Sequence, residues 1–289
     1  MRTRGDFTIH SFTIPFSEYD LPIYLLPFGD VHKSSPLHHA EKWDEYRQWA
    51  ALKPRSYFLG MGDYDDLAST SERFILNNEI LHDSTIQTLE GLYLNNTIRF
   101  ARDIEFMKGR LIGLLGGNHF GRFSNNTTTD QKLAELMGCA YLGVCSFVRL
   151  SFVNIARGEG HTGSHCVDLF LHHGKGGGGT AGASMNPVMK MAETADADIY
   201  LMGDNHQKGV LHKEKLRLTS GKQLNLSHRK QVFARTGSYL KGYEPNTISY
   251  IVDALLPPSD LGSIKIELTP RRSQKDGQDR EYIDIHASI

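Results

Sequence analysis

Residues 23–32 read Ile-Tyr-Leu-Leu-Pro-Phe-Gly-Asp-Val-His, an apolar run that ends in two potential metal ligands, Asp30 and His32. The run has the length and composition of a buried strand. Asp30 and His32 are two residues apart, so in an extended segment their side chains point to the same side and can hold one ion. This stretch therefore predicts a strand whose carboxyl end carries a functional site.

Four further apolar runs, at residues 57–61, 111–115, 167–171 and 199–202, end in polar groups of the same kind. The blocks that follow them are Gly62-Asp63, Gly117-Asn118-His119, His172-His173 and Gly203-Asp204-Asn205-His206. Segments with helical periodicity separate the runs, at residues 36–52, 71–108, 129–137 and 184–195. This alternation predicts βαβ units and a parallel sheet. Open α/β sheets bind their ligands at the carboxyl ends of strands, so we expect the blocks to meet there.

The chain shows no internal repeat and no clear linker, which favours a single domain over residues 1–289. We expect a helical insertion at about residues 66–108, close to the site. From about residue 207 onward the pattern is that of strands joined by polar turns, so the C-terminal part should be rich in β-structure. One domain of two facing sheets fits this order best.

The bulk composition is that of an ordinary globular protein, with 39% hydrophobic and 22% charged residues. Its 32 basic and 33 acidic residues give no strong global field, so net charge does not indicate nucleic acid as a partner and leaves it open. No segment is long and apolar enough to span a bilayer, and we expect no membrane partner. Three cysteines, Cys139, Cys145 and Cys166, do not suggest a disulfide framework and favour a cytoplasmic location.

The residue types at the strand ends suit a pair of metal ions. A carboxylate such as Asp63 can bridge two cations with its two oxygens, and Asn118 offers a neutral amide oxygen. Histidines favour manganese, iron or zinc over calcium. Two such ions roughly 3.5–4 Å apart clamp an attacking hydroxide and the oxygens of a phosphate.

The five blocks, in this order over positions 23 to 240, resemble those of the calcineurin-like metallophosphoesterase superfamily: D-x-H, G-D, G-N-H, an isolated H, and G-H-x-H. The resemblance implies an α/β fold of the four-layer α/β/β/α type, with two facing mixed β-sheets flanked by helices. It also implies hydrolysis of a phosphate monoester or diester by a dinuclear metal centre with a bridging hydroxide.

The resemblance also implies a role for each matching residue. Asp30, His32 and His206 would hold the first metal, and Asp63 would bridge. Asn118 would hold the second metal together with His172 or His173. These two histidines point to opposite faces of a strand, so we expect only one to bind. His119 would be the catalytic acid.

Two positions depart from the family pattern. Phe120 follows the G-N-H block where members often have an acidic residue, which removes an orienter of His119. Asp204 replaces the first histidine of G-H-x-H. As an oxygen ligand Asp204 would favour manganese, with iron, zinc, nickel and cobalt as alternatives, or it could leave the second site weak.

Several alternatives stay open at this stage. The substrate could be a nucleic acid, because six Lys or Arg stand against one Glu in residues 212–230. The chain could instead be a non-catalytic scaffold with a degenerate site, as is the retromer subunit of this fold. The glycine-rich loop around Lys175 is either a plain loop or an anion cradle. Asp65 and Asp66 are expected in a solvated turn or a helix cap. A homo-oligomer is also left open.

Overall fold

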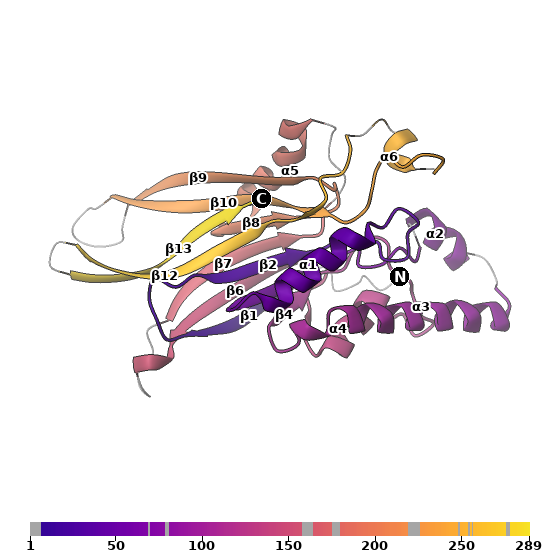
Figure 1. The fold of residues 1–289 in the computed structure, drawn as a ribbon, viewed down its shortest axis with the longest axis horizontal. Coiled ribbons are helices and arrows are strands. Elements are labelled where there is room, and N and C mark those ends of the chain that lie inside the picture. The colour runs from indigo at the N-terminus through magenta and orange to yellow at the C-terminus, as the bar shows by residue number, and fades with distance from the viewer. Residues whose placement is uncertain are drawn as a thin grey trace.

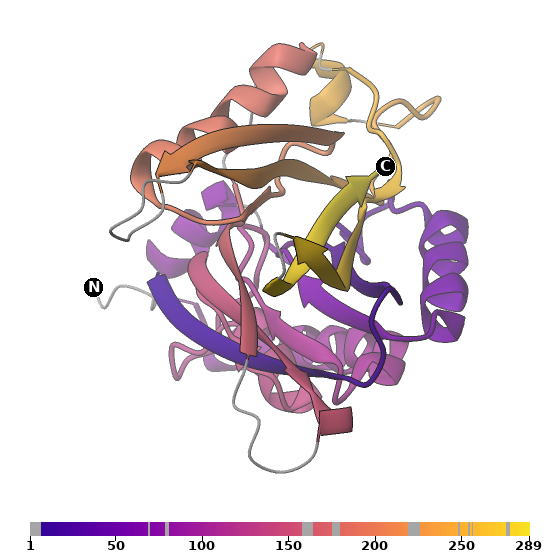
Figure 2. The same ribbon diagram turned by 90° about the vertical axis from the view of Figure 1, so that its left-hand side faces the viewer.

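The computed structural model describes residues 7–289 apart from 69, 79–80, 158–163, 175–179, 219–225, 248, 254, 256 and 276–277. The described chain forms four layers, in which two mixed β-sheets face each other and helices cover their outer faces (Figures 1 and 2). The expected α/β fold class is therefore confirmed.

The first sheet has six strands in the order β13-β12-β2-β3-β4-β5. Their bounds are β2 (Ile23–Phe28), β3 (Ser56–Gly60), β4 (Leu111–Leu114), β5 (Ala140–Tyr141), β12 (Lys265–Lys275) and β13 (Gln278–Ser288). Strands β2 to β5 are parallel, and the antiparallel hairpin β12–β13 pairs with β2. The parallel part is the one that the strand–helix alternation predicts.

The second sheet has seven strands in the order β1-β6-β7-β8-β10-β11, with β9 paired to β10. Their bounds are β1 (Phe7–Phe16), β6 (Cys145–Asn154), β7 (Ser164–His172), β8 (Ile199–Met202), β9 (Lys208–Leu218), β10 (Leu226–Ser238) and β11 (Gly262–Ser263). Strand β1 was not predicted, although its Phe12, Ile14 and Phe16 alternate with the exposed residues Ser11, Thr13 and Pro15. It pairs in parallel with β6 at the edge of the sheet.

Three apolar cores separate the four layers. The largest lies between the sheets and includes Leu59, Leu169 and Leu201. A second core, around Trp43 and Phe100, lies between the six-stranded sheet and the helices α1 (Ala40–Leu52), α3 (Asp83–Asp103) and α4 (Thr129–Met137). A third core lies under α5 (Ala181–Thr194), which covers the other sheet.

The segment for which we expect a helical insertion contains α2 (Thr70–Asn78), α3 and the short helix η1 (Glu105–Met107). The helices α1 and α3 are capped at their N-termini by His39 and His82, whose side chains accept hydrogen bonds from backbone N–H groups of the first turn. A short helix α6 (Tyr250–Asp253) and a 3-10 turn η2 (Ile155–Arg157) complete the elements. Within the described ranges, no helix is both long enough and apolar enough to cross a lipid bilayer.

Candidate metal centre

All five predicted blocks lie at the carboxyl ends of strands and meet between the two sheets. Asp30 and His32 follow β2, Asp63 follows β3, and the Asn118–His119 pair follows β4. From the other sheet, His173 follows β7, and the loop with Asp204 and His206 follows β8. Because parallel strands in both sheets end on the same side, segments far apart in sequence contribute to one site.

The backbone at this site is unusual. Among the described residues, ten other than glycine have a positive φ angle, and five of them belong to the predicted set. These five are Asp30, His32, Asp63, Asp204 and His206, with φ between 47° and 68°. This conformation costs free energy for residues with a side chain, so it persists only where surrounding contacts hold it.

Backbone hydrogen bonds between the loops supply those contacts. The N–H of Val31 donates to the Asp63 carbonyl at 2.8 Å, and the N–H of Gly203 donates to the His173 carbonyl at 2.7 Å. The Asp30 carbonyl accepts from the Tyr239 N–H and from the Ser238 hydroxyl, both at 2.9 Å. Ser238 and Tyr239, at the end of β10, therefore help to hold Asp30 in place.

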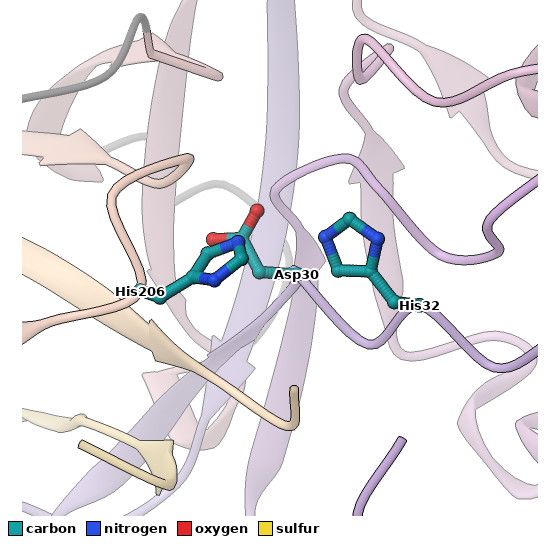
Figure 3. Close-up of side chains that lie close together, drawn as sticks. All are labelled: Asp30, His32 and His206. Carbon is teal, nitrogen blue, oxygen red and sulfur yellow. The ribbon is translucent and has the colours of Figure 1, made fainter. Parts of the chain in front are cut away.

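The first pocket consists of Asp30, His32 and His206, whose nearest ligand atoms lie within 4.8 Å of one another. Figure 3 shows the three side chains directed toward a common space from two different segments. The Asp30 atom Oδ1 and both ring nitrogens of His32 are buried without a hydrogen-bond partner. Burial lowers the pKa of His32 to about 3 and that of His206 to about 4, so both rings are neutral at physiological pH.

The second pocket consists of Asp63, Asn118, His173 and Asp204, and Asp63 borders both pockets. Its atom Oδ1 accepts the N–H groups of Asn118 and His119, at 2.6 and 2.9 Å. Its atom Oδ2 lies 3.3 Å from His173 Nε2 and 3.8 Å from His32 Nε2. We expected both carboxylate oxygens to face the ions, but two amides already use the lone pairs of Oδ1. Only Oδ2 faces both pockets.

The structure brings His173 into the cluster and turns His172 away. The His173 atom Nδ1 donates to the Met61 carbonyl at 2.7 Å, which leaves Nε2 buried and without a hydrogen-bond partner. A Cβ atom at Gly62 would lie 2.5 Å from that Nδ1, and Gly62 has a φ of +100°, so glycine is required there. The His172 atom Nδ1 instead accepts the Gly174 N–H at 2.8 Å.

Asp204 holds the side chain of Asn118. Its atom Oδ1 accepts from Asn118 Nδ2 at 3.0 Å and lies 3.7 Å from His173 Nε2. Since a carboxylate can only accept, this contact fixes the orientation of the amide. The Asn118 atom Oδ1 is left buried and without a partner. Asp204 therefore orients a predicted ligand, whether or not it binds metal itself.

Charge distinguishes the second pocket from the first. Burial opposes the charged form of His173, but the carboxylates of Asp63, Asp30 and Asp204 outweigh burial and raise its pKa to about 10. Burial likewise opposes the charged form of Asp63, and the neighbouring His173 nevertheless holds the pKa of Asp63 below its usual range. Without metal, the second pocket thus contains an imidazolium–carboxylate pair.

His119 lies beside both pockets and is paired with Asp66. Its atom Nδ1 lies 2.6 Å from Asp66 Oδ1. Burial alone would lower the pKa of His119, but the hydrogen bond to Asp66 raises it above the ordinary value. The expectation that Asp66 lies in a solvated turn or a cap was therefore wrong. Asp66 orients His119 from a position other than the one that Phe120 occupies. Asp65 does cap a turn, accepting the Ser34 N–H at 2.7 Å.

One buried residue near the site was not singled out in the sequence. Arg235, on β10, is fully buried and donates to the Gly203 carbonyl at 2.6 Å and to the Ser184 carbonyl at 2.9 Å. It ties the loop with Asp204 and His206 to helix α5. The sequence does carry a signal for a buried arginine, because Arg235 follows directly after the apolar residues 232–234. The loop around Lys175 lies outside the described residues.

The residues present fit divalent cations. Buried polar atoms are nearly always hydrogen-bonded in folded proteins. Here Asp30 Oδ1, His32 Nδ1 and Nε2, Asn118 Oδ1 and His173 Nε2 all lack a hydrogen-bond partner in one place. Carboxylate, amide and imidazole groups are all ligands of first-row divalent metals. The groups Asp30–His32–His206 and Asp30–Asp63–His173 can therefore each hold an ion.

No protein-family model matches the sequence, and no curated protein matches it. The solved structure of vacuolar protein sorting 29 from Cryptosporidium parvum is similar over 93% of this chain and 100% of that one. The two share 14% sequence identity and superpose with a TM-score of 0.34.

Proposed function

We propose that this protein is a metal-dependent hydrolase of phosphate esters with a dinuclear centre. The observation that supports it best is the arrangement around Asp63 Oδ2, which lies 3.8 Å from His32 Nε2 and 3.3 Å from His173 Nε2, both on buried imidazole rings. Such a carboxylate oxygen is suited to be shared by two cations. Manganese is the first choice of ion, with iron, zinc, nickel and cobalt as alternatives.

In this proposal, Asp30, His32 and His206 hold the first ion, and Asn118 and His173 hold the second. Asp63 would contribute to both, and Asp204 would orient Asn118 or add an oxygen ligand. When bound, the two cations would neutralise phosphoryl oxygens and lower the pKa of water to near neutrality. His172, whose ring nitrogen accepts the Gly174 N–H, has no role in the centre.

His119 acts as the general acid for the leaving alcohol. The Asp66 carboxylate accepts the hydrogen bond from Nδ1 of His119, so the proton available for transfer is the one on Nε2 of His119. Its raised pKa keeps the ring protonated to a higher pH, as an acid requires. The side chain of His119 is 29% exposed, so a substrate can reach it, whereas those of His32 and Asp63 are buried.

The decisive assay is turnover of bis(p-nitrophenyl) phosphate and of p-nitrophenyl phosphate by protein loaded with Mn²⁺, with metal content measured in parallel. We expect hydrolysis that is lost on chelation and restored by added metal. The ratio of the two rates separates a phosphodiesterase from a phosphomonoesterase. Two bound ions without turnover of either ester would show that the chain is a scaffold that retains the site.

A further inference from the structure

Strand β9 carries a row of cations on one face. It begins at Lys208, just beyond the loop that contains His206, and runs away from the candidate centre for 11 residues (Figure 1). Lys213, Lys215 and Arg217 occupy alternate positions and are all exposed. Side chains at alternate positions of a strand point to the same face. We call these three residues the basic ladder.

No described residue neutralises the ladder. None of its three side chains forms an ion pair or a hydrogen bond with the part of the chain that the structure describes. The one acidic residue of β9, Glu214, points to the opposite face and contacts His228. By contrast, Arg229 and Lys230 on the neighbouring strand β10 are paired with Asp198 and Asp284.

The three like charges of the basic ladder lie on one face of the sheet. Lys215 lies directly opposite Arg229 in the β9–β10 ladder, so their side chains share one face. Like charges in directly opposed positions destabilise a sheet. Asp196 and Asp198 offset the charge of Arg229, whereas Lys213, Lys215 and Arg217 have no such partners. A polyanion lying along β9 would remove this repulsion.

We propose that the basic ladder binds the phosphodiester backbone of a nucleic acid whose reacting phosphate lies at the metal centre. Lys213 and Arg217 are five and nine residues beyond the start of β9. At about 3.4 Å per residue they lie roughly 17 to 31 Å along the strand. One strand of a DNA duplex advances about 3.4 Å per nucleotide along the helix axis, so on a duplex the ladder would contact phosphates about five to nine nucleotides from the reacting one.

Contacts to phosphates carry no sequence information, so this surface would give affinity without sequence preference. It also reconciles a net charge of −1 with a polyanionic substrate, since the local row of cations and not the total charge attracts the backbone. The proposal narrows the substrate class of the proposed hydrolase to polynucleotides, although the binding itself does not depend on catalysis.

The test is fluorescence anisotropy of a labelled 20-nucleotide single strand and of a 20-base-pair duplex, with metal-free protein in EDTA so that nothing is cleaved. The variant is Lys213→Gln/Lys215→Gln/Arg217→Gln. The control, Arg99→Gln/Arg102→Gln/Lys108→Gln, removes the same charge from exposed positions on and just after α3. Both should retain wild-type hydrolysis of bis(p-nitrophenyl) phosphate.

We expect the ladder variant to bind the 20-nucleotide strand roughly 10- to 100-fold more weakly at about 0.1 M salt. The magnitude of the slope of the logarithm of its binding constant against the logarithm of the salt concentration should fall by about 2. The affinity of the control variant for the same strand should differ from that of the wild type by less than about 2-fold. A trinucleotide should bind to the wild type, the ladder variant and the control with the same affinity. Equal affinity and slope in the ladder variant and the control would overturn the proposal, and so would binding to anionic phosphatidylserine vesicles in place of DNA. Absence of hydrolysis in every protein would instead count against the proposed function.

Discussion

The two pockets of the candidate centre share Asp63 but are prepared for metal in different ways. The first pocket contains two imidazoles that burial keeps neutral, so their nitrogens are ready to bind. The second contains an imidazolium, a carboxylate and an amide that is held by a second carboxylate. A cation entering the second pocket must displace the proton of His173, whereas His32 and His206 have none to lose. The difference shows how neighbouring carboxylates decide which state a buried histidine adopts.

The largest expected effect comes from the residue common to both pockets. Asp63→Ala removes the oxygen that faces His32 and His173, together with the acceptor of two loop amides. We expect both ions to be lost and turnover to fall by more than about 10³-fold, since metal catalysis supplies several kcal/mol.

Asn118→Ala is the matched comparison, because it removes a ligand from the second pocket alone. Elemental analysis of both variants should show about one ion retained in Asn118→Ala and none in Asp63→Ala. Wild-type metal content in Asp63→Ala would refute the shared role of Asp63.

The next effect separates catalysis from metal binding. His119→Ala should keep both ions and lose roughly 10² to 10⁴ in turnover, the usual scale for a general acid. The loss should be smaller for substrates with good leaving groups, which need no proton. Loss of metal from His119→Ala, with no dependence on the leaving group, would show that His119 is a ligand instead.

Asp66→Asn tests whether Asp66 orients His119, and the measurement is the pH dependence of kcat. The hydrogen bond to Asp66 raises the pKa of His119, so its loss should lower that pKa. An acid must be protonated to act, and the alkaline fall in kcat should therefore move to lower pH. The neighbouring Asp65→Asn is the control and should leave the profile in place, since Asp65 caps a turn.

A smaller effect concerns the choice of metal in the second pocket. Asp204→His restores the pattern of the family that the sequence resembles, and it should raise the affinity for Zn²⁺ relative to Mn²⁺ because imidazole is the softer donor. Asp204→Ala should weaken the second ion by about 10- to 100-fold, the range for a lost supporting contact. Titration of metal-stripped protein with each ion gives both results.

Asp204→Asn distinguishes the two roles of this side chain. Asparagine can still accept from Asn118 but carries no charge. Affinity close to the wild type would assign Asp204 as an orienter, and affinity close to Asp204→Ala would assign it as a ligand. Unchanged affinity and preference in all three variants would exclude Asp204 from the centre.

The smallest effect is on the stability of the metal-free protein. His173 has a raised pKa, so its contribution is fully present below about pH 6.5 and is lost as pH rises toward 10. His32 has a lowered pKa, so it costs stability as pH falls from about 6.5 toward 3. A difference of one bound proton between the folded and the unfolded state changes the free energy of unfolding by up to about 1.4 kcal/mol per pH unit.

Urea unfolding in EDTA, with His173→Gln and His32→Gln compared to the wild type across pH, measures these opposite slopes. The wild-type advantage over His173→Gln should shrink above pH 6.5. Relative to His32→Gln, the wild type should lose stability below pH 6.5. Parallel pH curves for the wild type and both variants would show that the two pockets do not differ in protonation.

Much of this protein follows from local sequence. Apolar runs such as residues 23–28 and 199–202 became strands with the predicted bounds, because a short apolar run between turns is stable chiefly as a buried strand. The helix at residues 129–137 also has the predicted bounds, set by the Thr128–Gln131 capping box and by Gly138 with a φ of +66°. The polar blocks after five strands likewise located the candidate site.

Tertiary contacts decided the rest. The choice between His172 and His173 depends on the Met61 carbonyl, which lies just after β3 and accepts a hydrogen bond from His173. The role of Asp66 depends on its contact with His119, which is 53 residues away in the sequence. The left-handed backbone at Asp30 and Asp63 and the burial of Arg235 likewise require contacts between loops. Sequence by itself determined which chemical groups end each strand, because that is local. Only the folded structure determined which atom of each group remains without a partner, because that depends on segments brought together by the two sheets.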